Sequence, residues 1–265
     1  QLSAVYKLTG DVNVYAAFSE NDATSNSMAG GTVLGGNNEI NPLNFATENT
    51  LYEVGVKYAP NSSWYAEAAV FDQTRSLRNR DGSNSGVKTQ GFELQMFYQA
   101  DNVWVNAAYS YLDARFDNSA AFQGTAQVID AFDNSRPDII EGTGVGSPSF
   151  AAFPASDSRV QGIPPQIASI NAGWQITDDL QVGASALYTK SFPLDFLQTV
   201  HIRDQYTVDV NADYQVTDDL RLRLDIINVT DEENWQPLFE GGYFGATLVM
   251  PNVPRHAQVT MQYAF

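Results

Sequence analysis

The amino-acid sequence predicts an all-β fold, more specifically an antiparallel transmembrane β-barrel of which about eleven strands are present. Three observations support this prediction. Polar and apolar residues alternate with a period of two, short turns alternate with long polar segments, and aromatic residues gather near the ends of the apolar strand faces. Each observation is local in sequence, so together they predict strands, hairpins and membrane placement.

The alternation is clearest in residues 206–217, where even-numbered residues are apolar and odd-numbered residues are polar. Residues 220–226 repeat the pattern after the turn Thr217-Asp218-Asp219. A β-strand places successive side chains on opposite faces, so each segment has one polar and one apolar face. The pair therefore predicts a β-hairpin, and residues 169–188 around Thr177-Asp178-Asp179 predict another.

The same reasoning along the whole chain predicts eleven strands. They are longer than the usual five or six residues, and about nine to eleven tilted residues span a bilayer. The expected strands are residues 3–9, 11–19, 50–59, 63–77, 87–99, 103–116, 166–177, 180–190, 204–217, 220–229 and 254–265.

The connections between these strands alternate in length. Short turns lie near residues 10, 60–62, 100–102, 177–179 and 217–219. Long polar segments lie near residues 20–49, 78–86, 117–165, 191–203 and 230–253. Outer-membrane barrels have short periplasmic turns and long extracellular loops, whereas a soluble β-sandwich has no reason to follow this rule.

The apolar strand faces carry aromatic residues near the strand ends. Alternation alone also fits a soluble β-sandwich, whose apolar face would form a core. Amphipathic aromatic rings prefer the headgroup level of a bilayer, which favours the membrane barrel. These residues are Tyr52, Tyr58, Trp64, Tyr98, Tyr109, Tyr111, Trp174, Tyr188, Tyr206 and Tyr214.

Composition and motifs exclude several other classes. The chain has 265 residues, no cysteine and a formal net charge of −17, which argues against nucleic-acid binding and a disulfide framework. The sequence contains no run of about 18 apolar residues, so it predicts no transmembrane helix. The two histidines, His201 and His256, have no helical metal-site spacing, and no nucleophile elbow or nucleotide loop is present. The sequence therefore predicts neither an enzyme nor a cofactor site.

Four segments resemble TonB-dependent receptors of the bacterial outer membrane, and the last strand resembles outer-membrane barrels in general. The final residues alternate and end in Phe265, which resembles the C-terminal signal that the barrel-assembly machinery reads. Residues 224–232 (LDIINVTDE) resemble the penultimate-strand motif, and residues 49–58 (NTLYEVGVKY) resemble the Glu-x-Gly-x-Lys strand. Residues 163–166 (IPPQ) resemble a proline-containing strand entry, and Pro254-Arg255 resembles the closing motif of the family.

The resemblance implies a 22-stranded barrel filled by an N-terminal plug. Residues 1–265 would then be the C-terminal portion of the barrel, without the plug, the TonB box and the N-terminal strands. We also expect that the chain does not close into a pore by itself, because an open sheet edge in lipid leaves backbone groups unpaired.

The function implied by the resemblance is active transport across the bacterial outer membrane. Extracellular loops would bind a scarce nutrient, such as a metal chelate or siderophore, cobalamin or an oligosaccharide, and energy would come from TonB. The implied partners are the nutrient, outer-membrane lipid and lipopolysaccharide, the barrel-assembly machinery, the remainder of the barrel, and TonB-ExbB-ExbD through the missing plug. The alternatives are a passive diffusion porin and a secreted soluble β-sandwich module that binds glycans.

Candidate ligand-binding residues come from the long loops. Aromatic residues beside carboxylates could bind a sugar or a cationic chelate, or could simply pack the loops together. Arginines near the end of one strand could bind an anionic chelate or lipopolysaccharide phosphates. The candidates are Arg75, Arg78, Arg80, Phe150, Phe153, Trp235, Tyr243 and Phe244, and the expected assembly signal is Tyr263 with Phe265.

Overall fold

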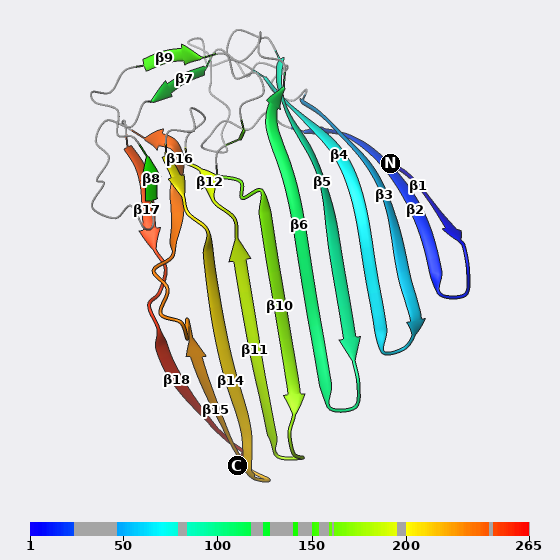
Figure 1. Cartoon of the computed structure of the whole chain (residues 1–265), viewed down its shortest axis with the longest axis vertical. Coiled ribbons are helices and arrows are strands. Elements are labelled where there is room, and N and C mark those ends of the chain that lie inside the picture. Colours follow the sequence, from blue (N-terminus) through cyan, green and yellow to red (C-terminus); the bar gives the residue numbers. More distant parts are fainter. Residues whose placement is uncertain are drawn as a thin grey trace.

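The computed structural model confirms an all-β chain built around one eleven-stranded antiparallel sheet (Figure 1). The structure describes residues 1–23, 47–78, 84–117, 124–127, 140–142, 150–153, 159–160, 162–194, 200–243 and 246–264. Among these residues, no helix has the length and apolar character needed to cross a membrane.

All eleven predicted strands are present in this sheet, which we call the sheet wall. Consecutive long strands pair antiparallel, so the strand order follows the sequence from β1 to β18. The strands are β1 (Leu2–Lys7), β2 (Val12–Ala23), β3 (Thr47–Asn61), β4 (Trp64–Arg78), β5 (Asn84–Gln99), β6 (Val103–Asp117), β10 (Gln166–Gln175), β11 (Leu180–Thr189), β14 (Gln205–Thr217), β15 (Leu220–Ile227) and β18 (His256–Tyr263).

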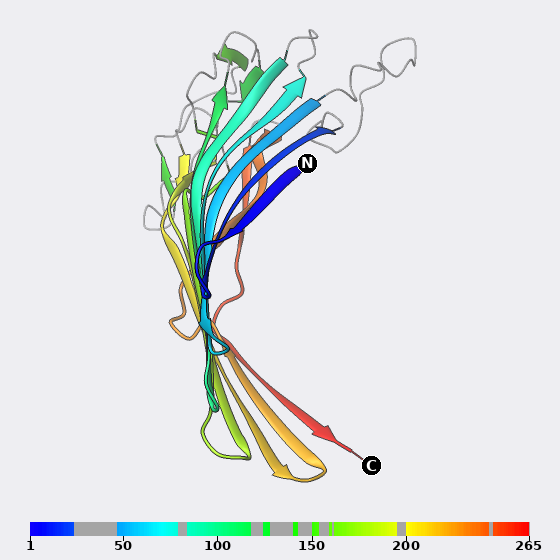
Figure 2. The same ribbon diagram turned by 90° about the vertical axis from the view of Figure 1, so that its right-hand side faces the viewer.

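The sheet wall is curved and open. Figure 2 shows its two edges, β1 and β18, bending toward the same side of the sheet. Each edge strand pairs with one neighbour, β1 with β2 and β18 with β15, and the described strands contain no ladder between β1 and β18. The expectation that the described sheet does not close on itself is therefore confirmed.

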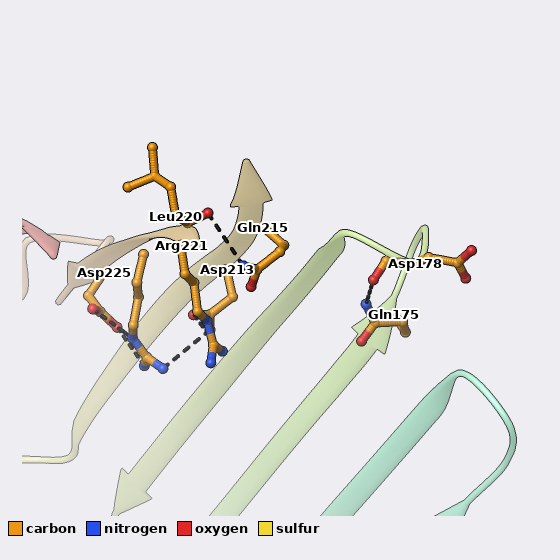
Figure 3. A network of polar contacts seen from close by, with 8 residues as sticks. Gln175, Asp178, Asp213, Gln215, Leu220, Arg221 and Asp225 are labelled. Carbon is orange, nitrogen blue, oxygen red and sulfur yellow. Dashed lines mark hydrogen bonds and ion pairs between the residues drawn. The ribbon is translucent and has the colours of Figure 1, made fainter. Parts of the chain in front are cut away.

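Two turns of the wall share the motif QxTDDL and a glutamine side chain bonded to the turn. Residues 175–180 (QITDDL) and 215–220 (QVTDDL) connect β10 to β11 and β14 to β15. In each turn the glutamine Nε2 donates to a turn carbonyl, at 2.8 Å from Gln175 to Thr177 O and 2.7 Å from Gln215 to Thr217 O. Figure 3 shows both glutamines beside their turns. These bonds hold the turn backbone in place from the polar face of the sheet.

The long segments between the wall strands contain short strands that the sequence prediction treated as loops. Two of these strands, β8 and β13, come from different loops and pair with each other, from Val200↔Gly142 to Ile202↔Ile140. Such pairing depends on where the loops meet in space and leaves no periodic signal in the sequence. The short strands are β7 (Gly124–Gln127), β8 (Ile140–Gly142), β9 (Phe150–Phe153), β12 (Phe192–Pro193), β13 (Val200–Ile202), β16 (Trp235–Tyr243) and β17 (Ala246–Pro251).

The strand registers separate an apolar face from a polar face across the sheet wall. Apolar residues stand opposite apolar residues, as in Val54↔Val70 and Ala172↔Ala184, and polar residues oppose polar ones, as in Asn211↔Asp225. Large apolar side chains on the first face are exposed, for example 56% at Val54 and 69% at Val259. A single curved sheet with an exposed apolar face differs from the β-sandwich alternative, in which that face would be covered.

Candidate functional site

One polar cluster lies on the inner face of β2, β3 and β4, around the carboxylate of Glu67. Tyr15 donates to Glu67 Oε1 at 3.0 Å, Tyr65 donates to the other carboxylate oxygen, and Lys57 Nζ lies 3.3 Å from Oε1. Lys57 also lies 5.0 Å from the centre of the Tyr15 ring, within the range of a cation–π contact. Both oxygens of Glu67 are therefore occupied by fixed donors.

This cluster explains the Glu-x-Gly-x-Lys motif of β3. The Tyr15 ring lies so close to Gly55 that a Cβ there would be 2.5 Å from its Cε1 atom. Lys57, two residues later on the same face, reaches Glu67 on the neighbouring strand. The glycine makes room for the ring and the lysine neutralises the carboxylate, so the motif serves packing and charge balance on this face.

A second polar cluster lies on the same face of the sheet as the Glu67 cluster, but near the other edge, on β14 and β15 (Figure 3). Asp213 is buried and accepts from two arginines, with Arg221 Nη2 at 2.9 Å and Arg223 Nη1 at 3.3 Å. Arg223 also contacts Asp225 at 2.7 Å. The alternation along β15 places these charges on one face of the sheet and Leu222 and Leu224 on the other, as predicted.

The polar face is the concave face of the sheet wall. Figure 3 views the sheet from the side opposite to Figure 1, the side toward which both edges bend in Figure 2, and shows Asp213 and Arg221 in front of the ribbon. The concave face can hold charged groups in fixed pairs along a polar interior. Among the described residues, no three His, Cys, Asp or Glu side chains are arranged to hold a metal ion.

The residues after β15 form a compact corner around Asn228. Asn228 is buried and has a φ of 54°, in the left-handed region that asparagine tolerates better than most residues. Its backbone N–H donates to Asp209 Oδ1 at 2.8 Å, and its side chain accepts from Glu232 N at 2.9 Å. The Nδ2 group donates to Glu232 O at 2.8 Å. The segment NVTDE therefore closes on itself through one amide side chain.

The same corner joins the penultimate strand to the last one. Arg255 N donates to Asp231 Oδ1 at 3.1 Å, and the Arg255 guanidinium reaches Val229 O at 3.3 Å. Asp231 also has a positive φ, 58°, and its carboxylate lies 3.5 Å from the Arg255 guanidinium. Two motifs about 25 residues apart in sequence, NVTDE and Pro254-Arg255, are thus one structural unit.

A small apolar core lies at the loop end of the wall, between the segment that joins β11 to β14 and the segment that joins β15 to β18. We call it the loop-end core: Phe192, Leu194 and Ile202 are buried, and Trp235 and Val249 pack against them. Trp235 N donates to Gln205 Oε1 at 2.5 Å, which ties the start of β16 to β14. The core joins segments from two loops, so these loops form a common platform above the wall.

A charged cluster on the outer face borders this platform. Asp204 accepts at 2.8 Å from Tyr188, from Lys190 Nζ and from the Ser191 backbone N–H. Burial by itself would raise the pKa of the Asp204 carboxyl, but these three donors stabilise the charged form and lower its pKa below the ordinary value. The hydrogen bond to Asp204 in turn raises the pKa of Lys190. The cluster fixes the segment between β11 and β14.

The sequence-predicted ligand residues have different outcomes. Trp235 packs in the loop-end core, which is the packing alternative considered for the loop aromatics. Arg75 is exposed on the concave face, opposite Asn49 and Val87. Four candidates lie in described strands, but their side chains are outside the described part: Arg78, Phe150, Phe153 and Tyr243. Three further residues lie wholly outside the described part: Arg80, Phe244 and Phe265. Tyr263 pairs with Leu220 in the sheet wall.

Sequence reasoning missed the residues that organise the site. The Glu67 cluster, Asn234 and the loop-end core join residues far apart in sequence, such as Tyr15 and Glu67 or Asn234 and Tyr206. The only sequence signal was indirect: the motifs around Gly55 and Asn228 were noticed as resemblances, without the contacts that explain them.

The family comparison identifies a known barrel domain. A family model described as TonB dependent receptor-like, beta-barrel, matches residues 1–229. The comparison with curated proteins finds no match.

Solved structures with the same fold are named as a siderophore receptor and as import or uptake receptors for ferric chelates. The siderophore receptor PiuA from Acinetobacter baumannii has a TM-score of 0.68 at 19% identity, covering 98% of this chain and 34% of that receptor. The ferric-catecholate import receptor Fiu from E. coli K12 gives 0.67 at 19% identity, covering 98% and 34%. The ferric yersiniabactin uptake receptor FyuA from Yersinia pestis gives 0.70 at 16% identity, covering 99% and 36%. This chain thus spans about a third of the length of these receptors.

Proposed function

This chain belongs to the TonB-dependent receptor-like β-barrel family, and we propose that it forms part of the wall of a bacterial outer-membrane receptor that imports a scarce nutrient with TonB-derived energy. The observation that carries the proposal is the family match over residues 1–229, which includes ten of the eleven wall strands. Family members are transport receptors rather than enzymes.

The open sheet supports a larger assembly of strands. In lipid, each unpaired backbone group costs several kcal/mol, so edge strands β1 and β18 need partners. We propose that the remainder of a barrel of about 22 strands supplies them, with residues 1–265 as its C-terminal portion and a plug inside. The charged concave face fits such an interior, because fixed ion pairs would face water or the plug instead of lipid.

The proposed nutrient is a ferric chelate. The solved receptors of the same fold are named for siderophores or ferric siderophore complexes. Arg75 is exposed at the loop end of the concave face, where a cation could attract an anionic chelate. We retain Arg78, Arg80, Phe150, Phe153, Tyr243 and Phe244 as candidate contacts, and treat Trp235 as a residue that supports the loops.

Transport can be tested with the intact protein in a host that lacks its own ferric siderophore receptors. We expect radiolabelled iron from at least one ferric siderophore to accumulate in cells with TonB and not in cells without it. Uptake that is equal with and without TonB would indicate a passive porin. No uptake of any iron, cobalamin or oligosaccharide ligand, in cells that carry the folded protein in the outer membrane, would contradict the proposal.

A paired substitution tests the contribution of the concave face. Arg75→Gln removes the proposed ligand cation, and we expect the half-saturating ligand concentration to rise about tenfold. Lys88→Gln is the matched control, because Lys88 lies next to β4 on the outer face in an ion pair with Asp72 at 3.3 Å. Equal effects of the two substitutions would remove Arg75 from the proposed site.

Assembly of the barrel is a separate proposal. We propose that the barrel-assembly machinery recognises the last strand through Tyr263 and Phe265. Deleting Phe265 from the intact protein should lower the amount of protein in the outer membrane and leave the stability of the folded barrel nearly unchanged. An unchanged amount in the outer membrane would contradict this role.

A further inference from the structure

The apolar outer face of the sheet wall contains a groove near the two QxTDDL turns. The groove crosses five strands, from the start of β6 to β15, and has a volume of about 560 Å³. Its side chains are almost entirely apolar, and the groove reaches down to the backbone of Gly173 and Gly183. The apolar side chains that line it include Ala172, Trp174, Val182, Ala184, Ala212 and Leu224.

The strand register creates this groove. Ala172 stands opposite Ala184 on β10 and β11, and Val182 stands opposite Ala212 on β11 and β14. Pairs of small residues on adjacent strands leave a hollow between the larger Trp174 and Leu224 side chains. A hollow of this chemistry on an exposed apolar face suits a flexible hydrocarbon chain, which can fill it without a polar partner.

A row of carboxylates lies in the two turns beyond the groove, and the first turn is nearer to the groove than the second. Asp178 and Asp179 follow β10, and Asp218 and Asp219 follow β14, and all four are exposed. In each turn a glutamine side chain donates to a turn carbonyl, as described above. Asp178 lies four residues after Trp174 and Asp179 lies three before Val182, about 10–13 Å along the strands. Asp219 lies five residues before Leu224, about 16 Å from the groove. A molecule with a hydrocarbon tail in the groove therefore has its polar end near the first turn, with the second turn adding negative charge further out.

The charge of the row selects among lipids. The outward-facing residues next to the turns are aromatic or aliphatic, at Trp174, Ile176, Tyr214 and Val216. Aromatic residues there are typical of the headgroup level. Carboxylates at that level attract an ammonium group and repel an uncompensated phosphate, and the chain's net charge of −17 acts in the same direction.

We propose that this groove is a binding site for a phospholipid with an ammonium headgroup, of the phosphatidylethanolamine class. One acyl chain lies in the groove, and the ammonium group pairs with the carboxylates of the first QxTDDL turn, Asp178 and Asp179, in the negative field of both turns. The proposal rests on the membrane placement proposed above and adds a preference for one headgroup.

A second groove on the same face provides an internal control. It lies between β3 and β6 and is lined by residues such as Ala66, Ala68 and Met96, with a volume of about 400 Å³. The turn below its β3–β4 part, Pro60-Asn61-Ser62, carries no charge. The neighbouring turns carry single acidic residues, Asp11 before β2 and Asp101 before β6, instead of paired aspartates. We therefore expect the second groove to bind acyl chains without the same headgroup preference.

The test uses the intact protein, purified in detergent and exposed to equal amounts of phosphatidylethanolamine and phosphatidylglycerol with identical acyl chains. Native mass spectrometry then counts the lipids that stay bound. We expect phosphatidylethanolamine to be retained about two- to fivefold more often, the ratio that exposed ion pairs produce. Equal retention, or a preference for phosphatidylglycerol, would overturn the proposal.

Variants separate the groove from the turns. Replacing all four aspartates with asparagine should abolish the preference, whereas Ala184→Leu with Ala212→Leu should reduce the number of retained lipids. Ala66→Leu with Ala68→Leu, in the second groove, should leave the preference unchanged. A preference that survives the asparagine variant would overturn the role of the turns.

Insertion into vesicles of the two lipids distinguishes this proposal from the proposed function. If the wild-type protein enters neither vesicle as a folded barrel, the membrane placement is wrong and both proposals fail. If it enters both vesicles and binds both lipids equally, only the headgroup site is wrong.

Discussion

Apolar side chains are buried in the loop-end core and exposed on the outer face of the sheet wall. In the loop-end core, Ile202 is 0% exposed and Leu194 is 1% exposed. In the sheet wall, Val54 is 56% exposed and Leu94 is 45% exposed, while Asp213 on the other face is buried at 8%. One region therefore has an apolar interior, and the other has a polar interior and an apolar exterior.

The difference indicates that the two regions meet different solvents. Apolar groups gather inside a structure when water surrounds it, as in the loop-end core. In a bilayer the hydrocarbon is outside, so an apolar exterior costs nothing and charges move to the concave face. The change occurs near Tyr188 and Tyr206, where side-chain hydroxyls meet the carboxylates of Asp204 and Glu232. This level marks the boundary of the proposed membrane zone.

Removing volume from the loop-end core should have the largest effect. We expect Ile202→Ala to cost about 2–5 kcal/mol of local stability, because a fully buried side chain leaves a cavity. Hydrogen exchange of peptides that cover β12 and β13 measures this loss. Val54→Ala in the sheet wall is the control and should stay within about 0.5 kcal/mol. Similar exchange in the two variants would mean that the loop-end core does not hold the loops.

A charge on the outer face tests the membrane side of the comparison. Val210→Arg should cost about 2–4 kcal/mol in folding titrations in bilayers, because Val210 lies in the middle of β14. Leu222 lies two residues from the start of β15, so Leu222→Arg should cost only about 0–1 kcal/mol.

The matched control for Val210→Arg is Ser185→Arg, on the concave face opposite Asp209. It should be tolerated, because the new charge has a polar surrounding and a carboxylate neighbour. Equal costs for Val210→Arg and Ser185→Arg would exclude an outer apolar face in lipid.

Crowding on the concave face should produce an intermediate effect. A Cβ at position 55 would lie 2.5 Å from the Tyr15 ring, so we expect Gly55→Ala to cost about 1–3 kcal/mol. Adding Tyr15→Leu should recover part of this loss, measured by the same titrations. Gly10→Ala is the control, because no atom lies within 4 Å of its added Cβ. If Gly10→Ala and Gly55→Ala behave alike, the Tyr15 ring is not packed on β3.

The smallest effect should come from the Asp204 cluster and should depend on pH. The pKa of Asp204 is lowered in the folded protein, so the unfolded chain binds its proton at a higher pH. The stabilisation is therefore present above the ordinary aspartate pKa of 3.8 and is lost as the pH falls through the lower folded pKa. Unfolding measured from neutral to acidic pH should show less loss in Asp204→Asn than in wild type. A steeper loss in the variant would contradict this sign.

Much of the sheet could be predicted because its signals are local. Period-two alternation and turns such as Thr217-Asp218-Asp219 gave the strands of the wall and both faces, and the structure confirms them. Boundaries shifted by a few residues; β3, for example, extends to Thr47–Asn61 instead of residues 50–59. The extra pairs lie toward the loops, where the sequence becomes polar on both faces and the alternation fades.

The candidate site was less predictable, because its contacts cross between distant segments. Trp235 was a ligand-binding candidate with loop packing as the alternative, and it packs against the cluster that contains Ile202 from another loop. Gly55 was noticed as part of a motif, but the structure explains the glycine by the Tyr15 ring, which leaves no room for a Cβ. No spacing rule in the sequence places that ring next to Gly55. Side chains that meet across strands depend on register, and register is set by the whole sheet.

By itself the sequence determined the strand order, the alternation of turns and loops, and the residues on each face, since each depends on neighbours within one hairpin. Only the tertiary structure decided the curvature of the wall, the pairing of β8 with β13, and the bond between Tyr15 and Glu67, which are 52 residues apart. Such contacts form when strands twist and pair in sequence order, which brings together side chains that share no local pattern.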